Sequence, residues 1–326
     1  MDFVITWVDG ADGNWVEKKN KYLDNGTRQS VAQYREWGLL KYWFRTVEKY
    51  APWAEKIYFV TCGQKPEWLN ENNPKLKLVN HKEFIPVEYL PTFSSHAIEL
   101  NLHRIEGLSE KFVYFNDDTY LGAPVKETDF FNGDLPKFAG VMSNLIPSIP
   151  ADPFVHFLSN NISVINAHFN KRDVLKRNFF KWYNIKYGKG FYKNIYLSAV
   201  SKFTGFYNCH NPSSMLKSVF CEVWEKEFEL LDKTCKNKFR QLSDVNQYVM
   251  SYYAACLGKF SPASPKESAF FTVGEGDERI YNAFKSQKYK HLCINDSVGN
   301  IDFDFEKEKI NSIMQSLFPE KSSFEK

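Results

Sequence analysis

The sequence predicts an α/β fold: a Rossmann-like, mostly parallel sheet flanked by helices, with a helix-rich C-terminal half that covers the strand ends. Several short runs of apolar and β-branched residues are continuous rather than alternating, which is typical of parallel strands buried on both faces. In roughly the first 145 residues these runs alternate with segments of helical periodicity. After about residue 150 helical patterns predominate.

The expected elements of the first half follow from local patterns. "DFVITWV" (2–8) is a short apolar strand that the turn pair Asp9-Gly10 ends. "EWGLLKYWFRTVEKY" (36–50) has apolar residues at i, i+3 and i+4, and Pro52 ends this helix because proline lacks the N–H donor. Further strands are expected at 56–62, 76–80 and 111–116, and a further helix at 94–108, capped by Ser94 or Ser95 and ended by Gly107.

The second half is expected to complete a single domain. Helices are predicted at 172–184, 212–231, 243–258 and 305–318, with one more strand at 269–274. The helix at 212–231 would begin at Pro212, a residue suited to the first helical position. We therefore expect one domain over residues 1–318, with an α/β core at about 1–145, a helix-rich part at about 146–318, and a polar tail at 319–326 that frays.

Composition excludes some classes of protein. The chain has 42 basic and 39 acidic residues, a balance that argues against a nucleic-acid partner. No stretch approaches the roughly 18 to 20 apolar residues of a membrane span, and the N-terminus lacks the basic region of a signal peptide. The six cysteines form no CxxC motif, which favours reduced thiols over a disulfide framework. A cytoplasmic protein is expected, with at most peripheral contact with the inner face of the cell membrane.

Acidic residues follow two of the expected strands. Asp9 follows the first, and Asn116, Asp117 and Asp118 follow the strand "KFVYF", so both groups lie at the carboxyl ends where open α/β sheets bind ligands. One interpretation is a capped turn. The other is a site for Mg²⁺ or Mn²⁺, which prefer carboxylate oxygens and share phosphate oxygens with a ligand. Neighbouring side chains on a strand point to opposite faces, and Asp118, nearer the turn, is the preferred ligand.

Other polar residues could serve a nucleotide or a sugar. Gly10 would let a nucleotide approach the backbone, but the glycine-rich fingerprints of nicotinamide enzymes and nucleoside triphosphate loops are absent. An amphipathic surface helix is the default explanation of the segment 91–104, but its hydroxyl and amide groups also suit a polyhydroxyl ligand. Its candidate ligand-binding residues are Thr92, Ser94, Glu99, Asn101 and Arg104.

Two later loops carry further candidates. His210 stands at a polar loop-to-helix junction, where a general base can reach a ligand, although a lone histidine is more often structural. Arg240 and Asp244 are four residues apart. They form either a solvated ion pair or, through the guanidinium, a site for phosphate oxygens.

Read in order, these stretches resemble the Stealth family of hexose-1-phosphate transferases, which includes bacterial capsular polysaccharide phosphotransferases and the animal N-acetylglucosamine-1-phosphotransferase. "DFVITWVDGADGNW" resembles the first family block, and residues 34–125, from "YREW" to "FNDDTYLGAPV", resemble the long and highly specific second block. "HNPSSMLKSVFCEVW" and "FRQLSDVNQYVMSYYAACLGK" resemble the shorter third and fourth blocks. Residues 123–205 match the blocks poorly, and acceptor specificity is expected there.

The resemblance implies transfer of a sugar-1-phosphate from a nucleotide sugar, most simply a UDP-sugar, to a hydroxyl of a glycan acceptor. Asp117 and Asp118 would hold Mg²⁺ or Mn²⁺ at the pyrophosphate, beside Asn116, and Arg240 would bind phosphoryl oxygens. His210 or an acid would take the acceptor's proton, and Asp9 would stand at the nucleotide end. Thr92, Ser94, Glu99, Asn101 and Arg104 would line the sugar side, with Gly10 and Asp244 also near the substrate.

Two alternatives stay open at this point. A metal-dependent glycosyltransferase would use the same donor, the same metal and the same pair of acids, but would release a nucleoside diphosphate. A non-catalytic module that binds nucleotide sugars or glycans would need neither His210 nor Asp118.

Overall fold

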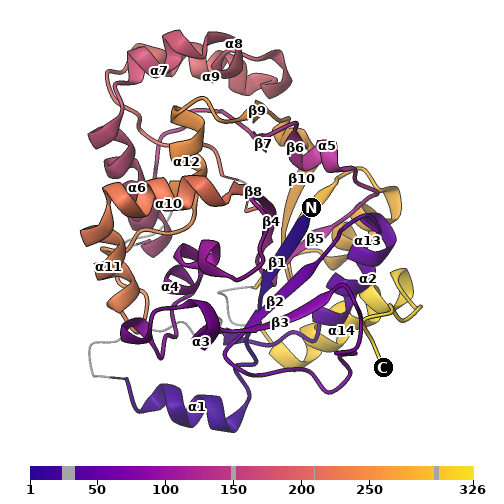
Figure 1. Cartoon of the computed structure of the whole chain (residues 1–326). Helices are drawn as coiled ribbons and strands as arrows, with labels where there is room; N and C mark the ends of the chain where they lie inside the picture. The colour runs from indigo at the N-terminus through magenta and orange to yellow at the C-terminus, as the bar shows by residue number, and fades with distance from the viewer. Residues whose placement is uncertain (24–33, 148–151, 209, 297–300) are drawn as a thin grey trace.

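The structure is a computed structural model that describes residues 1–23, 34–147, 152–208, 210–296 and 301–326. A central sheet runs through the molecule with helices on both sides (Figure 1). Its five strands have the order β3-β2-β1-β4-β8. They are β1 (Asp2–Thr6), β2 (Ile57–Thr61), β3 (Leu76–Asn80), β4 (Lys111–Phe115) and β8 (Ser213–Leu216). The first four are parallel, which confirms the mostly parallel sheet.

The fifth strand differs from expectation. Residues 213–216, predicted as the start of a helix, form β8 and pair antiparallel with β4, so that Met215 lies opposite Phe112. Met215 and Leu216 are buried there, and this burial against the sheet outweighs the local preference for helix. The helix α10 (Lys217–Lys226) follows directly.

Two three-stranded sheets extend the central one. β10 (Ser268–Thr272) is parallel to β11 (His291–Asn295), which pairs antiparallel with β5 (Thr119–Leu121). The third sheet contains β6 (Phe131–Asn132), β7 (Leu135–Phe138) and β9 (Ser261–Pro262). Because β4 belongs to the central sheet and β5 to the second, the chain crosses between sheets at Asn116-Asp117-Asp118.

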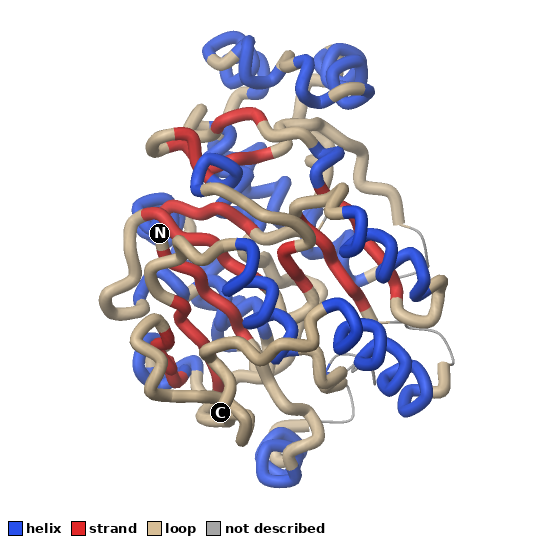
Figure 2. The backbone as a smooth tube through the Cα atoms, turned by 90° about the vertical axis from the view of Figure 1, so that its right-hand side faces the viewer, coloured by secondary structure: helices blue, strands red, loops and turns tan. Residues whose placement is uncertain are grey.

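Helices cover both faces of the central sheet. On one side lie α2 (Leu40–Tyr50), α13 (Asp277–Ser286) and α14 (Phe303–Leu317), which stand in front of the sheet in Figure 2. On the other side lie α4 (Ser95–Leu100), α6 (Pro153–His168), α10, α11 (Phe228–Lys236) and α12 (Tyr248–Cys256). The apolar face of α2 packs on the sheet: Trp43 lies edge-on to Phe115, with ring centroids 5.3 Å apart.

Six further helices of the described chain lie at the periphery. They are α1 (Gly13–Asn20), α3 (His81–Phe84), α5 (Glu127–Phe130), α7 (Lys171–Arg177), α8 (Phe179–Trp182) and α9 (Lys189–Ser198). The last three form a separate group at one end of the molecule, at the top of Figure 1.

The C-terminal segment 319–326, expected to fray, is packed against the fold. The Phe324 ring is buried 5.0 Å from the Phe44 ring, and Arg45 forms an ion pair of 2.6 Å with Glu325. Both charged side chains are almost wholly shielded from solvent. The polar composition of the segment does not indicate this packing, because Phe324 and Glu325, which anchor it, are single residues among exposed ones.

Two further sequence expectations concern cysteines and membranes. Cys62, Cys221, Cys235, Cys256 and Cys293 have free thiols, while Cys209 lies outside the described residues. Among the helices of the described chain, none has the length and apolar character needed to cross a lipid bilayer.

Candidate active site

A pocket lies at the carboxyl ends of the parallel strands. It encloses about 700 Å³ including its open mouth, a size suited to a small-molecule ligand. Each parallel strand contributes residues that follow it directly: Trp7 and Val8 after β1, Cys62 after β2, His81 after β3, and Asn116 and Asp117 after β4. Thr92, Ser95, Glu99 and Arg240 lie on the opposite wall. This is the position that the sequence predicts for a ligand.

The turn after β4 separates the two aspartates. The Thr119 amide and hydroxyl both donate to the Asn116 carbonyl, at 3.1 and 2.8 Å, and thereby reverse the chain. The Ile294 amide donates to the Asp118 carbonyl at 2.8 Å, which fixes the turn to β11. As a result Asp117 lines the pocket, while Asp118 contacts residues of other elements on the far side of the turn.

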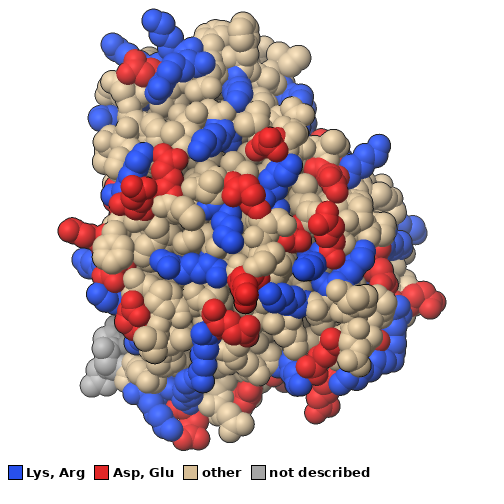
Figure 3. All heavy atoms as spheres, in the orientation of Figure 1, with Lys and Arg blue, Asp and Glu red and all other residues tan. Residues whose placement is uncertain are grey.

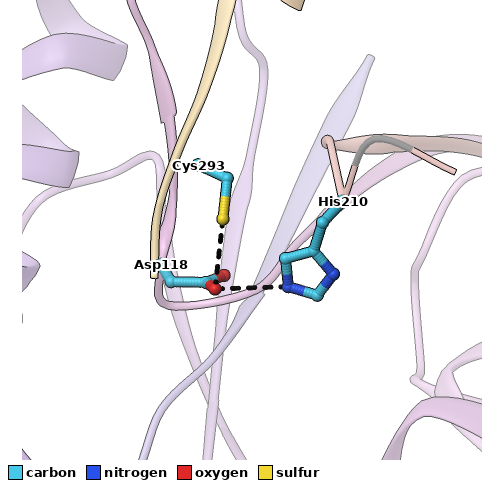
Figure 4. A group of neighbouring side chains, drawn as sticks. All are labelled: Asp118, His210 and Cys293. Atoms are coloured by element: carbon cyan, nitrogen blue, oxygen red, sulfur yellow. Dashed lines mark hydrogen bonds and ion pairs between the residues drawn. The ribbon is translucent and has the colours of Figure 1, made fainter. Parts of the chain in front are cut away.

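Asp118 is the centre of a cluster with His210 and Cys293 (Figure 4). His210 Nε2 lies 3.2 Å from Asp118 Oδ2, and the Cys293 thiol donates to the same oxygen at 3.3 Å. The other ring nitrogen of His210 lies 2.9 Å from the Tyr248 hydroxyl. His210 has a φ of +48°, and its amide donates to the Asn208 side chain at 2.8 Å. The ring is therefore held from several sides.

Two titratable groups at the turn, Asp117 and His210, have pKa values above their ordinary ones. Burial of the Asp117 carboxyl among the surrounding residues and the nearby charge of Asp118 raise the pKa of Asp117 to about 7, although part of the side chain is exposed to solvent. Burial lowers the pKa of His210 and the Asp118 carboxylate raises it. The carboxylate prevails, so the pKa of His210 lies above its ordinary value. The turn carries negative charge that a cation would offset.

The donor atoms at this turn fit a divalent cation. The buried Oδ1 of Asp118 accepts no hydrogen bond from any described residue, so it has free lone pairs. Asp118, His210 and Cys293 each offer one ligand atom, all within 4.8 Å of one another. Carboxylate oxygens suit hard ions such as Mg²⁺ and Mn²⁺, whereas a thiolate suits softer ones. Cys293 here donates its proton to Asp118, so it acts as a partner of the carboxylate.

The facing wall of the pocket carries both signs of charge. Arg240 is exposed, and its guanidinium donates to the Ser95 hydroxyl at 2.6 Å. Glu99 is buried, and one of its oxygens accepts from the Tyr114 hydroxyl at 3.2 Å. Its other oxygen has no partner among the described residues. A buried acceptor and an exposed cation in one pocket suit a ligand with hydroxyl and phosphate groups.

Four of the predicted substrate residues are placed away from this pocket. Asp244 is fully buried, and it accepts from the Asn237 side chain at 2.7 Å and the Gln241 amide at 2.8 Å. It therefore supports the loop that carries Arg240. Asn101 is buried and donates to the Ala97 carbonyl, Arg104 lies over the Trp224 ring, and Ser94 is buried behind the wall. Thr92 and Glu99 do line the pocket.

The turn after β1 also differs from expectation. A Cβ on Gly10 would lie 1.9 Å from the Tyr34 carbonyl oxygen, so the chain itself occupies the space that we assigned to a nucleotide. Gly10 serves this close backbone approach. Asp9 is not among the pocket-lining residues; its carboxylate accepts from the Ala11 amide at 2.9 Å, and its backbone bonds to Gln64.

Several residues of the site could not be identified from the sequence. Cys293 lies in "HLCIN" between the apolar residues Leu292 and Ile294, which give no sign of a ligand-binding position. Trp15, Tyr34 and Phe93 form one apolar wall of the pocket, with the Trp15 and Tyr34 rings 5.0 Å apart. Such flat surfaces accommodate a base or a sugar ring. The composition is rich in aromatics throughout, so these three do not stand out.

A second hollow lies on the other side of His210. One part, of about 800 Å³, is lined by His210, Phe154 and Phe270, and an adjoining part of similar size by Lys137, Phe138 and Tyr248. Tyr207 and Asn208 belong to both parts. His210 and the Asp117-Asp118 turn thus stand between two spaces large enough for ligands.

Comparison with known proteins places this geometry in a family context. Conserved region 1 of Stealth proteins matches residues 1–27, and conserved region 2 matches residues 33–138, which include the whole turn after β4. A capsular polysaccharide phosphotransferase, WcwK, of Streptococcus pneumoniae is 44% identical over 100% of this chain and 98% of its own length. A receptor polysaccharide phosphotransferase, WefC, of Streptococcus oralis is 40% identical over 100% and 99%.

A third relative and one solved structure complete the comparison. An exopolysaccharide phosphotransferase, cps2G, of Lactiplantibacillus plantarum is 39% identical over 100% of this chain and 96% of its own length. The crystal structure of galactosyltransferase LgtC with donor and acceptor sugar analogues aligns with a TM-score of 0.38 and 10% identity, over 97% of this chain and 96% of that one. That similarity is too low to bear on function.

Proposed function

Because the chain belongs to the Stealth family, we propose that it is an enzyme that transfers a sugar-1-phosphate from a nucleotide sugar to a hydroxyl of a capsular or cell-surface polysaccharide. The product is a phosphodiester, and a nucleoside monophosphate is released. The observation that carries this proposal is the placement of Asp117, Asp118 and His210 between a pocket at the strand ends and a second hollow. Full-length relatives named as polysaccharide phosphotransferases support it.

The pocket at the strand ends suits the donor. Its aromatic wall of Trp15, Tyr34 and Phe93 can take the base of a UDP-sugar, and the exposed Arg240 guanidinium can bind the pyrophosphate oxygens. Glu99 Oε2 accepts no hydrogen bond from the described part of the chain and can accept one from a sugar hydroxyl. The residues of this wall would hold the donor so that its reacting phosphorus lies toward the Asp117-Asp118 turn.

Asp117 and Asp118 would hold Mg²⁺ or Mn²⁺, an ion that supplies positive charge to the pyrophosphate when bound. Burial and, after it, the charge of Asp118 raise the pKa of Asp117, and a cation bound at this turn would offset both effects. Cys293 and Asn116 keep the turn in place from the two sides.

The second hollow suits the acceptor, and His210 stands at its border. The acceptor oxygen forms a bond to the sugar-bound phosphorus, the bond from that phosphorus to the nucleoside phosphate breaks, and its electron pair leaves with the nucleoside monophosphate. We assign the acceptor's proton to His210, whose pairing with Asp118 stabilises the imidazolium. Tyr248 fixes the orientation of the ring. We also propose that the acceptor is selected in part by Phe154, which lines this hollow and lies beyond the end of the second family region at residue 138.

The proposed place of action is the cytoplasm, at the inner face of the cell membrane. This place is proposed because the enzyme must have access both to a nucleotide-sugar donor and to a growing glycan.

Release of nucleoside monophosphate by the purified protein, with a panel of nucleotide sugars and Mg²⁺ or Mn²⁺, tests the proposal. Phosphorus NMR of the glycan product should show a phosphodiester signal. We expect His210→Ala and Asp118→Asn to lower turnover at least a hundredfold, while the exposed His156→Ala and Asp134→Asn leave it unchanged. Release of a nucleoside diphosphate would instead indicate a glycosyltransferase. Donor binding without any product, in the wild type, would indicate a binding module.

A further inference from the structure

The group of helices at one end of the molecule has an unusual composition. We define the α7–α9 lobe as residues 171–202, which contain α7, α8 and α9. It holds nine lysines and arginines and a single acid, Asp173, so its formal charge is +8. The whole chain carries only +3, which leaves −5 for the remainder. The chain's excess of positive charge is thus confined to this lobe.

The cations of the lobe are available to a partner. Seven are exposed: Arg172, Lys176, Arg177, Lys186, Lys189, Lys193 and Lys202. None of the ion pairs formed within the described parts of the chain includes a residue of the lobe. Basic side chains gather over this end of the molecule at the top of Figure 3. A surface of this kind attracts anions.

The same lobe exposes large apolar side chains. In α9, Tyr192 and Tyr196 are 72% and 76% exposed, and with Ile195 they occupy positions i, i+3 and i+4, one face of the helix. In the same lobe, Phe180 is 83% and Ile185 is 86% exposed. A helix of a globular protein normally turns such a face inward, but α9 turns it to solvent.

The exposure is not a result of loose packing, because polar side chains fix the lobe from inside. The buried Asn194 donates to the carbonyls of Gly140 and Trp182 at 2.7 and 2.6 Å and accepts from the Met142 amide at 2.6 Å. The buried ammonium group of Lys171 donates to three carbonyls in 197–202, at 2.7 to 3.1 Å. The apolar stripe is thus held outward on a rigid support.

From this combination we propose that the α7–α9 lobe docks on an anionic phospholipid surface, with Phe180, Ile185, Tyr192, Ile195 and Tyr196 in the interfacial region and the surrounding lysines and arginines at the phosphates. Aromatic side chains prefer the boundary between headgroups and acyl chains, and lysines extend their charged ends to the headgroups. The charge of +8 favours an anionic bilayer over a second copy of the lobe, since two such surfaces repel each other.

Co-sedimentation of the full chain with vesicles tests this proposal without donor or acceptor, so its outcome is independent of the proposed reaction. We expect binding to vesicles of phosphatidylcholine with 30% phosphatidylglycerol, little binding to pure phosphatidylcholine, and release in about 0.5 M NaCl. Lys186→Gln with Lys189→Gln should weaken binding about 25-fold, because each cation near an anionic surface contributes about fivefold. Tyr192→Ser with Tyr196→Ser should weaken it at least tenfold.

Matched variants elsewhere on the surface serve as controls. Phe228→Ser with Phe305→Ser removes two exposed aromatics outside the lobe, and Lys285→Gln with Lys288→Gln removes two exposed cations. Both should bind as the wild type does. Equal weakening by the control and lobe variants would overturn the proposal, as would wild-type binding that ignores lipid charge. Concentration-dependent dimerisation lost in the Tyr192→Ser, Tyr196→Ser variant, with no vesicle binding, would assign the lobe to a second copy and also overturn it.

Discussion

The buried ion pair that anchors the C-terminus offers a sharp test of the fold. Arg45 donates from Nε to one Glu325 oxygen at 2.8 Å and from Nη2 to the other at 2.6 Å. The two side chains are only 7% and 3% exposed. Glu325→Ala removes both charge-assisted bonds and leaves a cation whose remaining acceptors, among the residues that the structure describes, are the Phe318 and Pro319 carbonyls and the Gln315 side chain.

Two bonds of this type contribute about 1.5–3 kcal/mol each, and breaking one partner of a buried pair costs about 3–5 kcal/mol. We therefore expect a loss of about 4 kcal/mol in the free energy of unfolding. With about 2.1 cal/mol/K per residue, the unfolding entropy of 326 residues is about 0.7 kcal/mol/K, so the melting temperature should fall by about 6 °C.

Circular dichroism melting measures this shift, and Glu71→Ala supplies the control. Glu71 pairs with Lys65 at 2.8 Å, but both side chains are substantially exposed, so its loss should cost no more than about 1 kcal/mol. Arg45→Met with Glu325→Leu should recover most of the lost stability, because it leaves no buried charge unpaired. If Glu325→Ala melted within about 1 °C of Glu71→Ala, the pair would not anchor the segment 319–326.

Three further predictions concern the pocket and its surroundings. Gly10→Ala should cost about 1–3 kcal/mol, since its Cβ would meet the Tyr34 carbonyl, whereas Gly13→Ala has open space; urea midpoints of the two variants decide this. Burial lowers the pKa of His103 to about 3. The neutral ring therefore imposes no cost on folding above the unfolded pKa of about 6.5, and the free energy of unfolding falls by up to about 1.4 kcal/mol for each pH unit below it. Between pH 7 and pH 5, the free energy of unfolding should therefore fall about 2 kcal/mol less in His103→Phe than in the wild type, as urea unfolding at the two pH values would show. Equal losses in the wild type and the variant would contradict this prediction. Tyr248→Phe deletes the hydroxyl that contacts His210 Nδ1. It should lower kcat about tenfold and shift the pH–rate profile, while the KM for the donor stays unchanged. An unshifted profile would show that Tyr248 does not position His210.

The parts of the fold that short-range patterns determine could be predicted from the sequence. The apolar runs at β1, β2 and β4 and the periodicity of α2 identify these elements directly, and with them the edge of the sheet where the pocket lies. The strand β8 could not be found in this way, because "SSML" is a strand only through its pairing with β4. Long-range pairing of this kind leaves no local signal.

The same distinction applies to the candidate site. The Asp117-Asp118 pair is visible because two acids directly follow an apolar run, and His210 because it stands in a polar loop. Cys293 and the aromatic wall join them only through tertiary contacts. Asp244 stands near a candidate arginine in the sequence, but the fold buries its carboxylate, which accepts from the Asn237 side chain and the Gln241 amide and lies 3.4 Å from His96 Nδ1.

The turn between β4 and β5 connects the proposed donor pocket to the residues at the proposed acceptor hollow. Asp117 serves the pocket at the strand ends and Asp118 serves His210, yet a single peptide bond separates them. Inserting or deleting one residue at this position would exchange their directions and misalign both spaces at once. A change in the length of this connection would therefore disturb both spaces, whereas substitutions in the surrounding loops could alter donor or acceptor binding without moving the turn.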